Sequence, residues 1–297
     1  MLDNALENRR HEGIARSALK LARKLVPLRL KIALWQVIRS AKRQGGSLIG
    51  RYQCPVCGLR VIRFKQLPPD AITYGFKYSP NEAETCNAEH YSCPGCGASD
   101  RERLYVLYLR DYLRTIPPNN PASLPIKLID FGPTPTLSGF IRKLIAESPL
   151  TFCYRTADLF DQADDRVDIM EMPIYEDDSV DFFVCSHVLE HVVDDQKAMR
   201  ELYRILKPGR QGILVVPIVL TLKEIDEDPS VTDPAERWRR FGQDDHVRLY
   251  SKDGFLQRVS QAGFSVDELG LEYFGREAFR RYGIRERSIL YIVKKDD

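Results

Sequence analysis

With 297 residues, the chain is long enough for one full α/β domain and a smaller module. Its 29% charged and 43% hydrophobic residues are an ordinary globular composition, which excludes a largely disordered chain and a membrane-embedded one. The longest mostly apolar run, residues 212–222, is too short to span a bilayer, and the N-terminus lacks the apolar core of a signal peptide. We therefore expect a cytoplasmic protein.

The N-terminal segment, residues 1–48, is strongly basic. Residues 1–51 contain twelve Lys or Arg against three Asp or Glu, whereas the whole chain has a formal net charge of only +2. Apolar residues recur among these charges at roughly helical spacing until Gly45-Gly46-Ser47, which predicts a basic helical arm. Such an arm suits nucleic acid or peripheral contact with an anionic membrane surface, and it equally fits a solvated helix face.

Two Cys-x-x-Cys turns come next, Cys54-Pro-Val-Cys57 and Cys93-Pro-Gly-Cys96, each followed by glycine. Four thiolates at this spacing suit one tetrahedral Zn²⁺ and leave no open position, so we expect a structural ion. Two disulfides or a thioredoxin-like redox pair are the alternatives. The missing secretion signal disfavours the first, and the repetition of the same turn disfavours the second. We expect a zinc-ribbon-like module with a connecting helix over residues 49–116.

Strand-like and helix-like segments alternate from residue 122 to residue 297. Apolar runs predict seven strands, at residues 125–130, 150–154, 167–169, 180–185, 212–216, 264–269 and 288–293. A helical pattern follows the first strand, and a second one covers residues 196–206 before Lys207-Pro208-Gly209 ends it. This alternation predicts an α/β fold with a mostly parallel, doubly wound, seven-stranded sheet.

The first predicted strand ends in Asp130-Phe-Gly132, where doubly wound sheets bind their ligands. A pyrophosphate site needs glycines there, so that backbone amides can approach the phosphates. Pro133-Thr134-Pro135-Thr136 follows instead, which disfavours NAD or ATP. Carboxylates suit a ligand with a sulfonium, an ammonium and a ribose diol, such as S-adenosylmethionine. Besides Asp130, Asp158 and Asp168 fall at or near the next two strands.

Several segments then carry a specific resemblance. The segments are Val180-Asp-Phe-Phe-Val-Cys-Ser-His-Val-Leu-Glu-His-Val192, Met199-Arg-Glu-Leu-Tyr-Arg-Ile-Leu-Lys-Pro-Gly209, Tyr154-Arg-Thr-Ala-Asp-Leu159, Asp168-Ile-Met-Glu-Met-Pro173 and Phe241-Gly-Gln-Asp-Asp-His-Val-Arg248. Over about residues 124–297 they resemble class I S-adenosylmethionine-dependent methyltransferases, in particular methyltransferase-domain proteins with an N-terminal Cys-x-x-Cys module. The resemblance implies a Rossmann-like fold.

The resemblance also implies a set of cofactor-binding residues. Asp130 and Gly132 would face the methionine part of S-adenosylmethionine, Asp158 the ribose, and Asp168 with Ile169 the adenine. Thr134 and Thr136 depart from the family's glycine-rich pattern, which puts the cofactor affinity in question more than the cofactor's identity.

Histidines mark the expected acceptor side of the site. His187 directly follows the fourth predicted strand, and His246 lies beside an acidic neighbour that could set its tautomer. Either could act as a general base, and Arg248 could bind an anionic or sugar-like group. A buried, merely hydrogen-bonded histidine and a solvated arginine are the alternatives. Residues 217–250 break the strand–helix rhythm and predict a lid insertion over the acceptor pocket.

These observations predict a methyltransferase that acts on an oxygen or nitrogen atom of a small-molecule or glycan-type acceptor. An RNA methyltransferase that uses the zinc module and the basic arm is the second hypothesis, although aromatic residues interleaved with arginine are sparse. A non-catalytic binding protein with a decayed cofactor loop is the third. The sequence does not predict an oligomeric state.

Overall fold

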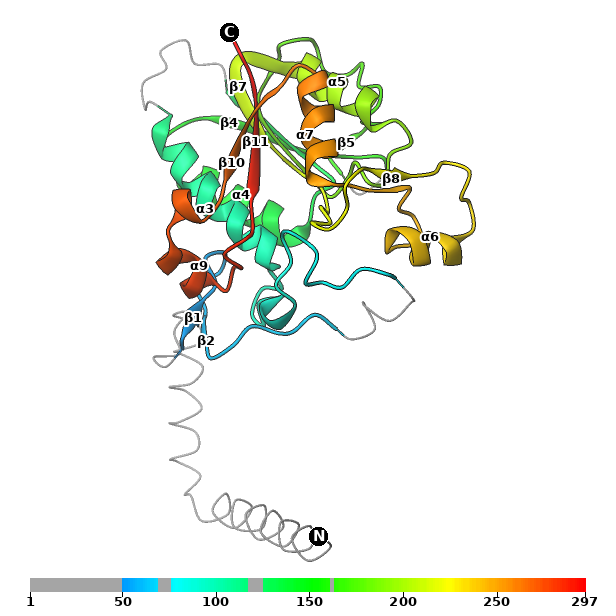
Figure 1. The fold of residues 1–297 in the computed structure, drawn as a ribbon. Coiled ribbons are helices and arrows are strands. Elements are labelled where there is room, and N and C mark those ends of the chain that lie inside the picture. Colours follow the sequence, from blue (N-terminus) through cyan, green and yellow to red (C-terminus); the bar gives the residue numbers. More distant parts are fainter. Residues whose placement is uncertain (1–49, 69–75, 117–124, 161–162) are drawn as a thin grey trace, which may run out of the picture. The chain divides into compact units, whose positions relative to one another are not determined.

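A central sheet organises the chain in the computed structural model, which describes residues 50–68, 76–116, 125–160 and 163–297 (Figure 1). Its seven strands have the order β10-β11-β7-β6-β3-β4-β5. The strands are β3 (Ile126–Phe131), β4 (Phe152–Asp158), β5 (Asp165–Arg166), β6 (Val180–Ser186), β7 (Leu206–Val215), β10 (Ser265–Leu269) and β11 (Leu290–Lys295).

Most neighbouring strands in this sheet are parallel. β4 and β6 flank β3 in parallel register, β5 is parallel to β4, and β7 is parallel to β6. Only β11 runs against its neighbours, β7 and β10. The prediction of a mostly parallel, seven-stranded Rossmann-like sheet is therefore confirmed. The carboxyl ends of β3, β4 and β6 meet at one edge, because Phe131 pairs with both Ala157 and Cys185.

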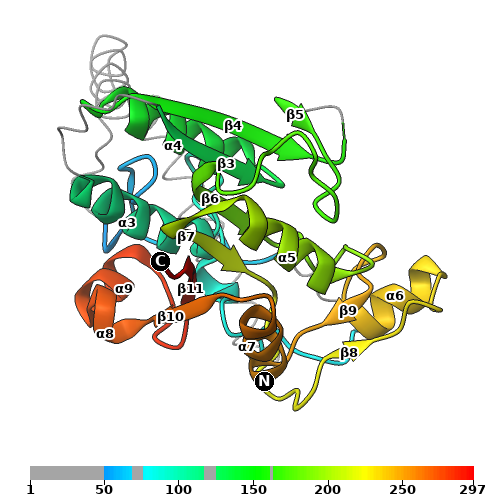
Figure 2. The same ribbon diagram turned by 90° about the horizontal axis from the view of Figure 1, so that it is seen from above.

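Helices cover both faces of the sheet (Figure 2). α3 (Asp100–Thr115) and α4 (Pro135–Ala146) pack on one face together with α9 (Arg276–Tyr282), which follows the one-turn α8 (Leu271–Phe274). α5 (Asp195–Ile205) and α7 (Lys252–Gln261) pack on the other face. The sheet is thus doubly wound, as predicted.

Side-chain caps fix where these helices begin. Ser99 and Glu102 form a reciprocal capping box at the start of α3. Thr134 caps α4 by accepting a hydrogen bond from the Leu137 amide, and Pro135 occupies the first turn, where its missing N–H costs nothing. Thr134, which stands where the sequence analysis expected a glycine, and the following Pro135 therefore serve to start a helix.

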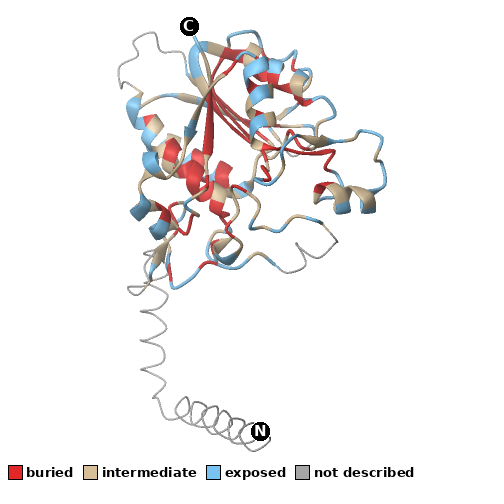
Figure 3. Cartoon of the chain, viewed as in Figure 1, coloured by how far each residue is buried: buried red, intermediate tan, exposed pale blue. Residues whose placement is uncertain are grey.

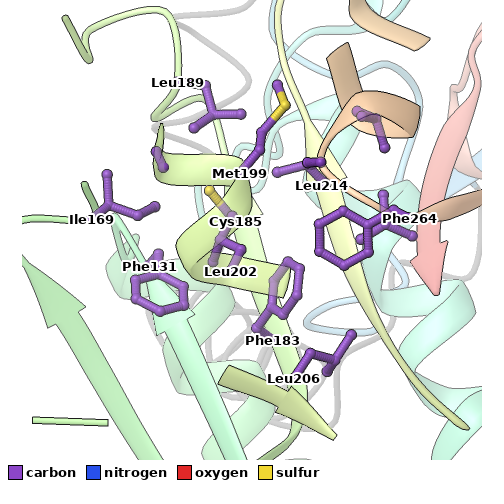
Figure 4. Close-up of a cluster of buried hydrophobic side chains, with 14 of the residues drawn as sticks. Phe131, Ile169, Phe183, Cys185, Leu189, Met199, Leu202, Leu206, Leu214 and Phe264 are labelled. Carbon is purple, nitrogen blue, oxygen red and sulfur yellow. The ribbon is translucent and has the colours of Figure 1, made fainter. Parts of the chain in front are cut away.

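Two apolar clusters hold the layers together, one on each face of the sheet. Figure 3 shows that buried residues concentrate along the strands and on the inner faces of the helices. Successive residues of β6 point to opposite faces. Phe183 packs with Met199 and Leu202 of α5 (Figure 4). Phe182 instead packs on the α3 side of the sheet. A β6 that is buried on both faces explains the continuous apolar run from which this strand was predicted.

Short elements form the cysteine module, which we define as the described residues from 50 to 99. β1 (Tyr52–Gln53) and β2 (Arg60–Val61) pair in antiparallel fashion around the first Cys-x-x-Cys turn, and a 3-10 helix covers Ala88–His90. A small apolar cluster forms around the cysteines, and α3 begins directly after the second turn. Residues 49–297 form one compact unit.

The segment after β7 departs from strand–helix alternation, as the sequence indicated. It contains β8 (Asp226–Glu227), α6 (Pro234–Phe241) and β9 (Arg248–Leu249), with β8 and β9 paired antiparallel. A separate small cluster around Val219, Phe241 and Leu249 packs this segment.

Two predicted boundaries were wrong. The strand expected at residues 167–169 lies at Asp165–Arg166 instead, because Asp168 accepts a hydrogen bond from the Met170 amide and turns the chain. β7 begins at Leu206, directly after α5, and passes through Gly209 at φ 66°. The expected basic arm at residues 1–48 lies outside the described residues. Within the described part of the chain, no helix is long and apolar enough to cross a bilayer.

Candidate active site

A pocket of about 470 Å³ lies at the carboxyl edge of the sheet. Five residues predicted from the sequence line it together: Gly132, Asp158, Asp168, Ile169 and His187. They come from the ends of β3, β4 and β6 and from the turn after β5. Residues as far apart in the sequence as Gly132 and His187 therefore line the same pocket.

Gly132 shapes the bottom of this pocket. Its φ of 62° lies in the left-handed region that favours glycine, and its amide donates a hydrogen bond to the carbonyl of Ala157 (3.0 Å). A Cβ on Gly132 would lie 2.7 Å from a methyl carbon of Val188. A side chain at this position would therefore strain the backbone and crowd the loop after β6.

Asp158 and Asp168 present carboxylates from neighbouring turns. Oδ1 of Asp158 accepts the Phe160 amide (2.9 Å), and Oδ1 of Asp168 accepts the Met170 amide (2.9 Å). Each carboxylate is therefore held in place by its own turn. Asp158 and Phe160 also line a second hollow of about 650 Å³ beside Pro133 and Arg142.

Asp130 does not line the pocket. Its carboxylate is buried and accepts hydrogen bonds from Ser138 of α4 (2.9 Å) and Tyr154 of β4 (2.7 Å). Burial raises the pKa of Asp130 to about 6, although these two hydroxyl donors act in the opposite direction. In this position Asp130 ties β3 to its two neighbouring elements.

The two threonines that replace family glycines contact the cysteine module and the start of α3. The hydroxyl of Thr134 donates to the Glu102 carboxylate (2.5 Å). The hydroxyl of Thr136 donates to the Cys96 carbonyl (3.0 Å). Hydrogen bonds to α3 and to the second Cys-x-x-Cys turn therefore hold the loop after β3 in place.

His187 stands where β6 leaves the sheet. Its φ of 56° is unusual for a non-glycine residue, and its amide donates to the Val215 carbonyl (2.8 Å). Nδ1 of His187 lies 3.1 Å from the buried Glu190 carboxylate. Burial lowers the pKa of His187 to about 4, so its imidazole is neutral at pH 7.

His246 and Arg248 lie behind the pocket wall. His246 is 5% exposed, and its Nδ1 donates to the Phe241 carbonyl (3.0 Å). Arg248 is 3% exposed; its guanidinium donates to the carbonyls of Leu189 (2.6 Å), Val192 and Val193 (2.8 Å). The segment between β7 and α7 therefore contacts the loop after β6 through Arg248.

The four predicted zinc ligands lie together. One sulfur atom from each of Cys54, Cys57, Cys93 and Cys96 lies within 4.8 Å of the other three. The Sγ atoms of Cys54 and Cys96 are 3.7 Å apart, and those of Cys57 and Cys93 are 3.8 Å apart. A tetrahedral zinc with Zn–S bonds of about 2.3 Å needs sulfurs about 3.8 Å apart. These two distances match the spacing of thiolates around one tetrahedral zinc ion.

Some pocket residues were not predicted from the sequence. Leu159 and Phe160 at the rim are exposed apolar side chains, Phe160 to 73%. Asp245, in the segment between β7 and α7, also lines the pocket, and Glu190 is buried beside His187. For Glu190, the available sequence signal was an acidic residue directly before His191 and just after the fourth predicted strand.

Comparison with known proteins identifies the class. The sequence family described as "Methyltransferase domain" matches residues 100–269, which is more than half of the chain. No curated protein matches the chain. Solved structures similar to it include the CMeT domain of the citrinin polyketide synthase, with 13% identity and a TM-score of 0.47. That match covers 70% of this chain, and this chain spans about half (55%) of that one.

A second similar structure is an S-adenosylmethionine-dependent methyltransferase from Archaeoglobus fulgidus. It has 12% identity and a TM-score of 0.40, and the match covers 65% of this chain and 94% of that one. The family match over residues 100–269 is what assigns the class. The chain belongs to the class I S-adenosylmethionine-dependent methyltransferases.

Proposed function

We propose that the 470 Å³ pocket binds S-adenosylmethionine, with Asp158 at the ribose and Asp168 with Ile169 at the adenine. The supporting observation is that these residues line one pocket with Gly132, although they come from separate strand ends. A carboxylate can accept two hydrogen bonds from a ribose diol. The exposed apolar side chains of Leu159 and Phe160 offer surface for a purine.

Bound S-adenosylmethionine supplies a methyl group on a sulfonium, and transfer of that group requires mainly alignment and exclusion of water. Of the three predicted catalytic residues, we assign His187 to the acceptor, because it lines the pocket. Arg248 acts through the loop carbonyls that it binds, and so is a positioning residue. The lid role of residues 217–250 is supported by Asp245, which brings this segment to the same pocket.

We infer that the acceptor is an oxygen or nitrogen atom of a small molecule or a glycan-type group. The pocket rim is mixed, with His187, His191 and Asp245 beside Val192 and Val193. Polar groups that converge in an apolar hollow suit a small polar acceptor better than a stacked nucleobase chain.

We also infer that the four cysteines hold a structural Zn²⁺. The sulfur spacing supports this metal, and four thiolates leave no open coordination position for a substrate. The glycine after each turn adopts a positive φ and donates its amide to the first cysteine's carbonyl, as with Gly58 and Cys54 (2.9 Å).

Labelling tests the acceptor class. Full-length protein is incubated with methyl-labelled S-adenosylmethionine and a host extract separated into small molecules, glycans, RNA and protein. We expect label in the small-molecule or glycan fraction, and none with a Gly132→Val variant, whose side chain would crowd Val188. Label confined to RNA would overturn the acceptor assignment and would support the second hypothesis.

A further inference from the structure

A buried carboxylate without a hydrogen-bond donor lies next to the proposed cofactor pocket. Glu190 is 0% exposed, and neither of its carboxylate oxygens has a hydrogen-bond partner among the described residues. His187 approaches Oε1 to 3.1 Å but not with hydrogen-bond geometry. An ionised carboxylate that is buried without compensation is strongly unfavourable. A positively charged group, such as a bound cation, would stabilise the buried Glu190 carboxylate.

Two imidazoles converge on the same carboxylate. One ring nitrogen each of His191 and His246 and one oxygen of Glu190 all lie within 4.8 Å of one another. The two rings are nearly perpendicular, with centroids 4.7 Å apart. A backbone hydrogen bond from Val247 to Glu190 (2.9 Å) holds the lid segment against this loop.

The polar contacts of both histidines are made by Nδ1 and leave Nε2 for a cation. Nδ1 of His246 faces the Phe241 carbonyl at 3.0 Å, and Nδ1 of His191 faces the Asp245 carboxylate at 3.0 Å. Because Nδ1 of each ring faces an acceptor oxygen, Nε2 is the ring nitrogen left to face a cation. Histidines that ligate a metal hold their second nitrogen in this manner.

We propose that Glu190, His191 and His246 bind one divalent first-row transition-metal ion, such as Zn²⁺, Fe²⁺ or Co²⁺. Two imidazoles and one carboxylate are a donor set that these ions favour. Metal bonds of about 2.0–2.1 Å need ligand atoms about 3.3 Å apart, so the three side chains close together slightly on binding. His191 is partly exposed and is free to make this movement.

Three protein ligands leave coordination positions open, and His191 also lines the pocket. An oxygen of the acceptor, from a hydroxyl or carboxylate group, would complete the coordination. This last step rests on the proposed function, whereas the metal site itself does not. A protein that binds the metal but transfers no methyl group would contradict the proposed function alone. A protein that transfers a methyl group but binds no metal at these residues would contradict the metal site alone.

Cobalt binding to the full-length protein tests the site. The cysteine cluster is first loaded with one equivalent of Zn²⁺, and Co²⁺ is then titrated while its visible absorption is followed. We expect one equivalent of Co²⁺ with ligand-field bands but no thiolate-to-metal charge transfer. Glu190→Gln and His191→Ala should each weaken Co²⁺ binding at least ten-fold, and Asp245→Ala about ten-fold, because Nδ1 of His191 then loses the carboxylate that it faces.

Glu84→Gln is the matched control, because Glu84 is also a buried glutamate but lies against Tyr291 instead. It should bind Co²⁺ as the native protein does. If Glu190→Gln does not fold, the cobalt affinity of His191→Ala tests the proposal instead. The His191 ring is partly exposed and contributes little to the core, so this variant should fold. Absence of cobalt binding beyond the cysteine cluster, or equal binding by His191→Ala, would overturn the proposal.

Discussion

The hydroxyl of Thr136 donates a hydrogen bond to the carbonyl of Cys96, 3.0 Å away. In the same loop, the hydroxyl of Thr134 donates a hydrogen bond to the Glu102 carboxylate of α3. The loop after β3 is therefore tied both to the second Cys-x-x-Cys turn and to the helix that follows it. The proposed zinc site and the proposed cofactor site therefore share this loop.

We therefore expect that loss of the zinc ion weakens the cofactor site. Cys93→Ser removes a thiolate that is buried in the cluster, so the turn that carries Cys96 loses its order. Coupling of this kind is typically about 1–3 kcal/mol, which corresponds to a roughly 5- to 150-fold weaker affinity for S-adenosylmethionine. Calorimetry with S-adenosylmethionine, together with metal analysis, measures both effects.

Cys153→Ser is the control for this prediction, because Cys153 is exposed on β4 and distant in sequence from both turns. It should retain zinc and native affinity. Undiminished S-adenosylmethionine binding by zinc-free Cys93→Ser would mean that the loop after β3 is stable without the cysteine module.

Asp158→Ala should weaken S-adenosylmethionine binding without unfolding the protein. The side chain is partly exposed, and its only described hydrogen bond is to the local Phe160 amide. Loss of a charge-assisted hydrogen bond to the ribose costs about 1.5–3 kcal/mol, or about 10- to 100-fold in affinity. Calorimetry measures the affinity, and thermal melting checks the fold.

Glu171→Ala is the control, since Glu171 is an exposed acid in the neighbouring turn that begins at Asp168 but does not line the pocket. If Asp158→Ala binds S-adenosylmethionine as tightly as the native protein does, Asp158 does not bind the ribose. A fall in both variants would indicate a general disturbance of this edge of the pocket rather than a lost ligand contact.

The sequence predicted the elements well but not the contacts between distant residues. Strong apolar runs such as residues 180–185 predicted buried strands, and the Cys-x-x-Cys spacing predicted the cluster. The strand expected at residues 167–169 was wrong, because a side-chain turn at Asp168 overrides its β-forming residues. Strand-end position alone could not predict that the Asp130 carboxylate turns toward Tyr154.

Long-range side-chain contacts explain the remaining differences. Arg248 was expected at the acceptor, but its guanidinium binds carbonyls 55 to 59 residues earlier in the chain. No periodic pattern encodes such a pairing. Likewise, the convergence of Glu190 with His246 depends on how the segment between β7 and α7 folds back.

Arg248→Lys should destabilise the fold. The planar guanidinium donates to three loop carbonyls and to Glu227 at once, and an ammonium group cannot reproduce that geometry. Buried acceptors would lose their partners, at a cost of about 3 kcal/mol in the free energy of unfolding. Urea denaturation measures this change. Arg239→Lys, which alters an exposed ion pair with Glu236, should leave stability native.

A pH-dependent stability is expected from Glu84, which is buried at the edge of the cysteine module. Burial raises the pKa of Glu84 from 4.5 to about 7, although the Tyr291 hydroxyl donates to both of its oxygens (3.0 and 2.8 Å). The folded state therefore holds this proton more tightly than the unfolded state does. The stabilising contribution is complete below pH 4.5 and is lost as the pH rises to about 7.

Glu84→Gln should remove this contribution to the pH dependence, because the amide is neutral at every pH and still accepts from Tyr291. A shift of this size corresponds to about 3 kcal/mol. Relative to the native protein, the variant should gain stability in urea denaturation between pH 5 and pH 8. The exposed Glu272→Gln variant should show no such gain. Parallel stability profiles for native protein and Glu84→Gln would mean that Glu84 keeps an ordinary pKa, with Lys252 and Arg287 offsetting its burial.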